Sequence, residues 1–167
     1  LMATRIAVLG DVNQDFIMRS EAMPRPGETC LARELRFAAG GKGGNQAVAA
    51  ARAGAQVQLI SAVGDDPFGA QLLAGLEREG VGTEFVLRGQ QVASGMAFIV
   101  LSPTGQNSIL HAPGAAELVT PEWVDKAARA IVDAQWLLVT LGVPVPSALR
   151  ALQIARDIVF NLNRKKS

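Results

Sequence analysis

The chain has 167 residues, of which 49% are hydrophobic and 19% charged, which predicts a folded domain with a real core and excludes a disordered chain. Sixteen basic residues against fifteen acidic ones give a net charge of +1, so no sustained field of one sign is available for nucleic acid or an anionic membrane. The expected partner is therefore a small molecule.

The start of the chain and its single cysteine bear on where the protein works. Arg5 precedes an apolar stretch of only five residues, shorter than a signal-peptide core and far shorter than a membrane span. Cys30 is the only cysteine, which excludes an intramolecular disulfide and a cysteine zinc cluster, and we expect it to be buried as a small apolar side chain. These features predict a cytoplasmic protein in a reducing compartment.

The first half of the chain alternates predicted strands and helices. Residues 6–9 predict a buried strand, and a polar loop, GDVNQD (10–15), follows it. Residues 43–53 are strong helix formers, and Gly54 suits the position after the helix, where positive φ is needed. Residues 57–62 predict a second buried strand.

A second helix is predicted from Asp66, an N-cap followed by proline, to about Glu79. Asp65 and Asp66 could be mistaken for a metal pair, but a helix cap and turn explain them better. Strand, helix, strand, helix in this order calls for a parallel sheet covered by helices, an α/β fold in three layers.

A hairpin interrupts this order. Residues 94–101 and 107–111 predict two strands joined by a turn at 103–105. Together with an exposed strand at about 28–38, this segment (94–111) would form a small β lid over the mouth of the main sheet. His111, the only histidine, falls in a lid strand with no evident Ser or Cys partner, and we expect it to be structural.

The α/β order then resumes towards the end of the chain. A helix opens at Thr120, a strand follows at 136–140, a helix at 147–156 and a last strand at 158–160. We therefore divide the chain into an α/β part, residues 1–156, and a divergent basic tail, residues 157–167.

The richest segment is a glycine-dense loop, GGKGGNQ (40–46), that leads into the first helix. Its glycines allow backbone N–H groups to approach a ligand, and the helix N-terminus adds partial positive charge. The loop is not a Walker A motif, because no Ser or Thr follows Lys42, and Gln46 stands where GxGxxG needs its third glycine. A nucleotide site here, and with it a dinucleotide-dependent oxidoreductase, is disfavoured.

Polar residues after the first strand complete a candidate site. Asn13 and Asp15 follow that strand at the sheet end where α/β proteins bind ligands. A carboxylate that accepts, an amide that donates and accepts, and Lys42, which only donates, form a complementary set for a polyol.

Several motifs together resemble the ribokinase, or PfkB-type, family of carbohydrate kinases. The matching segments are residues 10–15, PGET (26–29), GGKGGNQAVAAARAG (40–54), VGDDPFG (63–69), SGMA (94–97) and APGA (112–115). The resemblance covers about residues 5–156 and implies a ribokinase-like fold. By that resemblance the sugar would be held by Asn13, Asp15, Gly41, Lys42 and Asn45, with Gln14, Gly43 and Gly44 lining the same contacts and Ala97 and Ile99 packing over it from the lid.

The resemblance also implies an activity, the ATP-dependent phosphorylation of a sugar hydroxyl. The lysine followed by Asn-Gln-Ala resembles ribokinases, so ribose to ribose 5-phosphate is the first expectation, with Mg²⁺ and a monovalent cation as further cofactors. A homodimer through the lid strands is the expected assembly. Two departures bear on the choice of sugar: Gly142 replaces a sugar-facing glutamate, and Ala116 replaces an asparagine.

The catalytic aspartate that the family carries in a Gly-Ala-Gly-Asp segment has no match in this sequence, nor has the Asn-x-x-Glu segment. The chain therefore reads as a truncated, sugar-binding half, with no catalytic residue, no metal ligands and no ATP site of its own, and we expect it to be inactive alone. An unpaired edge of the cut sheet would make it self-associate. A non-catalytic sugar-binding fragment and a kinase of another sugar or nucleoside stay open as alternatives.

Overall fold

The computed structural model describes residues 3–164, and a parallel sheet forms its centre. The strands of this main sheet are β1 (Arg5–Leu9), β4 (Gln56–Gly64), β5 (Val81–Gly82), β6 (Val86–Gly89) and β9 (Trp136–Val139). Their order is β5-β4-β1-β9, β6 also pairs with β4, and every pair is parallel. The predicted parallel sheet is confirmed.

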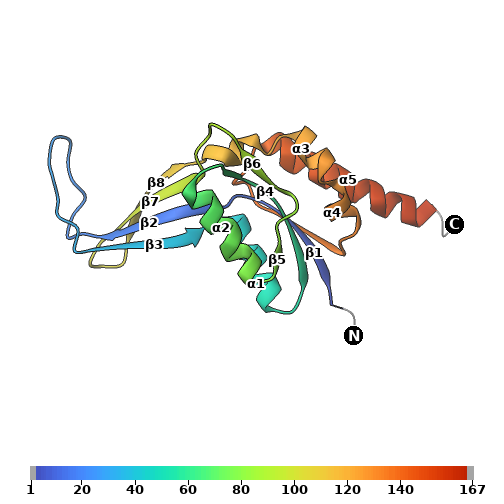
Figure 1. Ribbon diagram of the computed structural model, residues 1–167, viewed down its shortest axis with the longest axis horizontal. Helices are drawn as coiled ribbons and strands as arrows, with labels where there is room; N and C mark the ends of the chain where they lie inside the picture. Colours follow the sequence, from blue (N-terminus) through green and yellow to red (C-terminus); the bar gives the residue numbers. More distant parts are fainter. Residues whose placement is uncertain (1–2, 165–167) are drawn as a thin grey trace.

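Helices cover both faces of this sheet (Figure 1). The helices are α1 (Lys42–Arg52), α2 (Pro67–Arg78), α3 (Pro121–Lys126), α4 (Ala128–Val132) and α5 (Val145–Arg164), with a 3₁₀ helix at Gly114–Leu118. Val8 of β1 lies in a core with α1 and α2, whereas its neighbours Ala7 and Leu9 lie in a second core with α3, α4 and α5. Because both faces of the strand are buried, its sequence is a continuous apolar run, and the predicted three layers are confirmed.

A second, smaller sheet extends from the body towards the left of Figure 1. It contains β2 (Asn13–Arg19), β3 (Glu34–Gly40), β7 (Gly95–Leu101) and β8 (Asn107–Ala112), in the order β3-β2-β7-β8. β2 and β7 are parallel, and the other two pairs are antiparallel. We call this sheet the lid, and the predicted hairpin of β7 and β8 is confirmed.

The predicted helix caps are present. Gly54 has a φ of 91°, and the Thr120 side chain accepts a hydrogen bond at the start of α3. Asp66 accepts a hydrogen bond from the backbone N–H of Gly69 at 2.7 Å and two from Ser94, at 2.7 and 2.8 Å. Although burial raises the pKa of Asp66, the hydrogen bonds from Ser94 and Gly69 leave it below its ordinary value. Asp66 thus caps α2 and ties it to the base of the lid.

Four predictions about local structure are wrong. Residues 10–15 are not one loop, because the lid strand β2 begins at Asn13, and residues 28–33 precede β3 as exposed irregular chain. Cys30 lies in that irregular segment and is exposed.

Residues 158–160 belong to α5 and not to a strand. Ala151, Ile154, Ala155 and Ile158 pack on the core at helical spacing, and this contact extends the helix through the predicted strand. Of the predicted tail, residues 165–167 lie outside the described residues.

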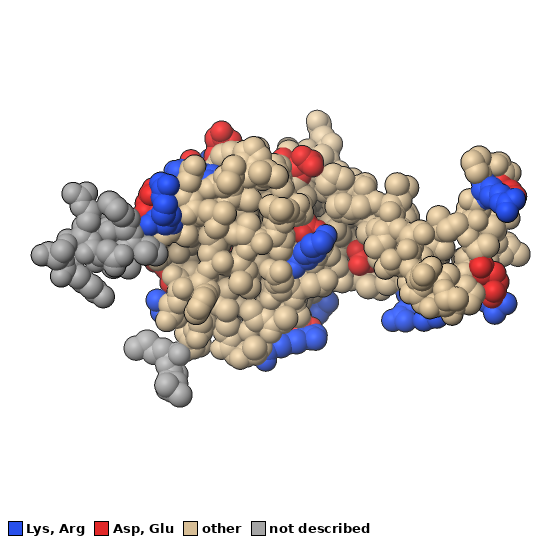
Figure 2. Space-filling view, turned by 180° about the vertical axis from the view of Figure 1, so that it is seen from behind, with Lys and Arg blue, Asp and Glu red and all other residues tan. Residues whose placement is uncertain are grey.

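The surface carries no dominant charge on the side that Figure 2 shows, where acidic and basic side chains are interspersed. Within residues 3–164, none of the helices has the length and apolar character needed to cross a membrane.

Candidate functional site

The predicted residues of the lid share one face of its sheet. Asp15 of β2 pairs with Ala97 of β7, and Ala97 pairs with His111 of β8. Paired residues point to the same side of a sheet, so these three side chains stand in a row, with Asn13 and Ile99 two positions away on that face. Asn13 and Ala97 are buried, and Ile99 is partly buried.

The glycine-dense loop meets this row at the end of β3. Gly40 pairs with Asn13, and a side chain at Gly40 would lie 2.2 Å from a carboxylate oxygen of Asp15, so Asp15 covers the bare backbone there. Gly41 is the N-cap of α1, and Lys42 is its first residue. Asp15 and the start of α1, with the exposed Lys42 and Asn45, therefore lie at the same end of the structure.

The start of α1 lies against the end of β1. A Cβ on Gly43 would lie 2.5 Å from the carbonyl carbon of Gly10, so only glycine fits at this contact. The N–H of Gly43 donates to the Asp11 carboxylate at 3.4 Å, and that of Gly44 donates to the Asp11 carbonyl at 3.0 Å. An acidic group at a helix N-terminus is stabilised by the helix dipole, so the first amides of α1 already have an acceptor.

Asp11, which our sequence analysis did not select, is at the centre of the site's polar contacts. The residue is 1% exposed, and its carboxylate also accepts from the Asn13 amide at 3.0 Å and the Thr140 hydroxyl at 3.4 Å. The Asn13 amide nitrogen lies 3.1 Å from Nε2 of His111. The signal for Asp11 was an acidic residue two positions after a buried strand, whereas His111 depends on lid register, which the sequence does not give.

The electrostatics of the site act on Asp15. Partial burial raises the pKa of Asp15 above its ordinary value, His111 opposes this rise, and the nearby Asp11 adds to it. Asp15 is thus a half-buried carboxyl group that interacts with both neighbours.

Gln14 does not join this group. It alternates with Asn13 and Asp15 along β2 and faces the other side of the lid, where its amide donates to the carbonyl oxygen of Ala38 at 3.0 Å. The backbone of Gly44 lies near this group. A Cβ added at Gly44 would lie 3.5 Å from the Val12 side chain, which is an ordinary contact.

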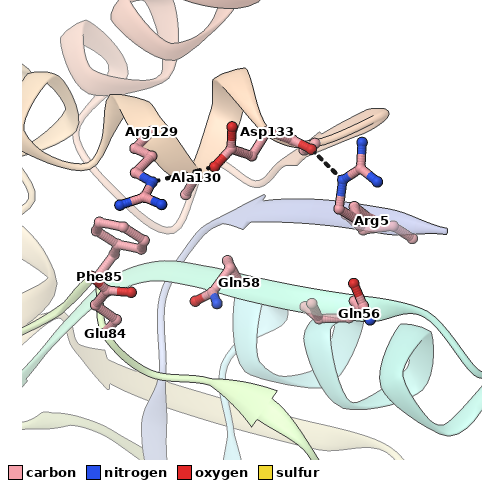
Figure 3. A pocket seen from close by; sticks show the side chains of 11 residues that line it. Arg5, Gln56, Gln58, Glu84, Phe85, Arg129, Ala130 and Asp133 are labelled. Carbon is pink, nitrogen blue, oxygen red and sulfur yellow. Dashed lines mark hydrogen bonds and ion pairs between the residues drawn. The ribbon is translucent and has the colours of Figure 1, made fainter. Parts of the chain in front are cut away.

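Two cavities help to locate the site. One of about 460 Å³ lies between α1 and α2 and reaches Gly40, Gly44 and Asn45. The other, of about 270 Å³, lies where β1 and β4 begin, at the opposite end of the strands (Figure 3). Its arginines already have partners, because Arg5 donates to the carbonyl oxygen of Asp133 and Arg129 pairs with the Asp133 carboxylate. The candidate site therefore remains at the carboxyl ends.

The part of the chain that the structure describes contains no group of three or more His, Cys, Asp and Glu side chains placed to hold a metal ion. Asp65 and Asp66 do not form such a group, and Asp66 acts as a helix cap.

The fold is that of an α/β protein with a candidate site where the lid sheet meets the carboxyl ends of the main sheet. The sequence pattern of the pfkB family of carbohydrate kinases matches residues 3–164, so the chain belongs to this family. The predicted family resemblance and fold class are confirmed.

Three similar proteins show what these relatives do. A ribokinase of Schizosaccharomyces pombe is 37% identical over 93% of this chain and 52% of its own length. A deoxyribokinase of Salmonella typhimurium is 35% identical over 90% of this chain and 49% of its own length. The structure of Arabidopsis thaliana ribokinase complexed with ribose and ATP has a TM-score of 0.84 and 28% identity, over 94% of this chain and 51% of that one. The chain spans about half the length of the curated relatives it matches.

We predict that Gly43→Ala destabilises the fold. The new methyl group would meet the backbone of Gly10, which cannot rotate away, so α1 must shift. We expect the free energy of unfolding, measured by urea denaturation, to fall by about 2 kcal/mol. Gly75→Ala is the matched control, because a Cβ there meets only the end of Arg78 at 3.7 Å within α2. The control should gain about 0.5–1 kcal/mol, and equal effects of both changes would contradict the prediction.

Proposed function

We propose that the protein carrying this chain transfers a phosphoryl group from ATP to a pentose hydroxyl, with ribose to ribose 5-phosphate as the first reaction, and that these residues hold the sugar. The observation that carries the proposal is the meeting of Asn13 and Asp15 with the start of α1 at the carboxyl ends of the sheet. Membership of the carbohydrate kinase family and similarity to ribokinases support it.

In this proposal each group has a role set by its chemistry. The Asp15 carboxylate accepts hydrogen bonds from sugar hydroxyls, the Asn13 amide lies beside it, and Lys42 and Asn45 donate from α1. Gly41, Gly43 and Gly44 line the same site by letting the start of α1, with Lys42 and Asn45, lie close to Asp11 and Val12. Ala97 and Ile99 provide an apolar cover from the lid.

The residues of this site do not fit the phosphates of ATP. The amides of Gly43 and Gly44 are occupied by Asp11, and the carboxylates of Asp11 and Asp15 would repel an anion. We therefore assign the site to the neutral acceptor sugar. Binding of ATP, Mg²⁺ and a monovalent cation belongs to the proposed activity of the whole protein.

Deoxyribose is a second candidate substrate. A deoxyribokinase is among the similar proteins, and Gly142 offers no side chain to a sugar hydroxyl. Comparing ribose with 2-deoxyribose in one assay distinguishes the two, and sugar binding without phosphorylation would favour a non-catalytic sugar-binding role.

We predict that Asp15→Ala weakens ribose binding by about tenfold to a hundredfold, because a charged acceptor for sugar hydroxyls is lost. Calorimetry on the chain measures binding, and a coupled ADP assay on the full gene product with ATP and Mg²⁺ measures phosphorylation. Asp125→Ala is the matched control. Asp125 lies on α3, where it forms an exposed ion pair with Arg150, and the variant should bind ribose like the unmodified protein. A protein that binds and phosphorylates no pentose would refute the proposed function.

We predict that ribose affinity falls as the pH is lowered through the pKa of Asp15, because the protonated carboxyl group loses its charge. Since burial raises this pKa, the fall should begin at a higher pH than for an ordinary aspartate, whose pKa is about 3.9. Ribose itself does not titrate, so the loss reports protonation of groups in the protein. The same raised pKa means that acid stabilises the folded state at this residue, so unfolding at Asp15 does not explain the loss. Removing His111 by His111→Leu should move the midpoint of the affinity curve to higher pH. A midpoint that moves down would contradict this assignment.

We also propose that two copies of the chain pair through the lid. On the face away from Asp15, Phe37, Phe16, Phe98 and Leu110 stand in register across the four strands, and Leu110 is 74% exposed. We predict that Leu110→Asp converts the dimer to monomer in sedimentation velocity experiments, because it places a charge in this row. If the copies associate instead through the edge strand β9, where Trp136 is exposed, Trp136→Lys should convert the dimer to monomer and Leu110→Asp should not.

A further inference from the structure

The Asn13 amide is held from two sides. Its Nδ2 donates to Oδ2 of Asp11 at 3.0 Å and lies 3.1 Å from Nε2 of His111. Asp11 receives only donors, since its other oxygen accepts from Gly43 and Thr140. An ionised carboxylate accepts hydrogen bonds and never donates them, so the amide must turn its NH₂ group towards Asp11.

This orientation also sets the direction of the contact with His111. With Nδ2 of Asn13 as the donor, Nε2 of His111 is the acceptor. Asp11, Asn13 and His111 therefore form a chain of three side chains from the end of β1, through β2, to β8.

The same orientation turns the amide oxygen of Asn13 away from Asp11. Asn13 is 5% exposed, and within the described residues its Oδ1 has no hydrogen-bond partner. The oxygen faces Gly95 of β7, where a Cβ would lie 2.3 Å away. Leaving a buried acceptor without a partner is costly, so the amide is held in this orientation by the contacts of its NH₂ group with Asp11 and His111.

Gly142 is required by the same arrangement. A Cβ there would lie 2.0 Å from Oδ1 and 2.2 Å from Cγ of Asp11, so any other residue would displace the carboxylate. Gly142 is not among the glycines with positive φ, so backbone conformation does not demand glycine at this position. Its smallness makes room for Asp11.

We propose that Asp11 and His111 are positioning residues that hold the Asn13 amide in one orientation beside the sugar site, and that Gly142 provides the space for Asp11. This inference rests on the proposed function. It makes sugar affinity depend on two residues that need not touch the sugar.

The central test is Asp11→Asn. The Gly43 N–H and the Thr140 hydroxyl donate to Oδ1 of Asp11, so in the variant they select the amide oxygen at that position. The NH₂ group of the new asparagine then takes the position of Oδ2 and faces the NH₂ group of Asn13. Two donors cannot pair, so the Asn13 amide turns over and presents NH₂ where it presented oxygen. We expect the Kd for ribose, measured by calorimetry, to rise about tenfold or more. Asp125→Asn on α3 is the matched control and should leave the Kd unchanged.

A second pair of variants keeps the test independent of folding, because His111 is exposed. His111→Leu removes the acceptor and should weaken ribose binding by about three- to tenfold, whereas His111→Gln supplies an oxygen acceptor and should stay within about twofold. In the full gene product the KM for the sugar should rise while the KM for ATP does not. A purely structural role would not separate Leu from Gln.

The outcomes are distinguishable. If the unmodified protein binds no pentose, the proposed function fails and this inference with it. If the unmodified protein binds ribose and Asp11→Asn and His111→Leu bind it equally well, only the inference is overturned. Gly142→Ala should weaken binding as Asp11→Asn does, and should add nothing in an Asp11→Ser background. An additional loss in that background would contradict the assignment of Gly142.

Discussion

The contact between the start of α1 and the end of β1 determines the geometry of the whole site. Gly10 and Gly43 have no side chains, so the helix backbone lies directly against the strand end. This brings the first amides of α1 to Asp11, and Asp11 in turn holds Asn13 and Thr140. Groups from β1, β2, α1 and the end of β9 converge because two backbones can approach closely at one point.

The lid follows from the same place in the chain. Only residues 10–12 separate β1 from β2, so the chain passes from the main sheet into the lid almost without a loop. The parallel pairing of β2 with β7 then puts Ala97 between Asp15 and His111. Because Ala97 is small, the two outer side chains interact across it, and His111 opposes the rise in the pKa of Asp15. The lid thus supplies polar groups of the site as well as its cover.

Local signals in the sequence predicted most of the fold, and long-range pairing explains most of what they missed. Asp66, Thr120 and Gly54 marked helix ends correctly because caps act over a few residues. The apolar run from Ile158 suggested a strand because β-branched residues favour strands, but packing against the core decided for a helix. The rule for the ends of parallel strands located Asn13 and Asp15, whose role in sugar binding stays a prediction. The lid register, which brings His111 to Asn13, has no local signal.

The charges of the site bear on the kind of ligand it can hold. Asp11 lies close enough to Asp15 to add to the rise in its pKa, and Lys42 is the one cation of the glycine-dense loop. Two carboxylates against one lysine disfavour a second anion, because burial weakens the screening of their repulsion. A neutral polyol has no such cost, and its hydroxyls can donate to each acceptor that the protein leaves open. A sugar that already bears a phosphate would need that group to point away from Asp11 and Asp15, so in the proposed function the charge balance favours an unphosphorylated sugar.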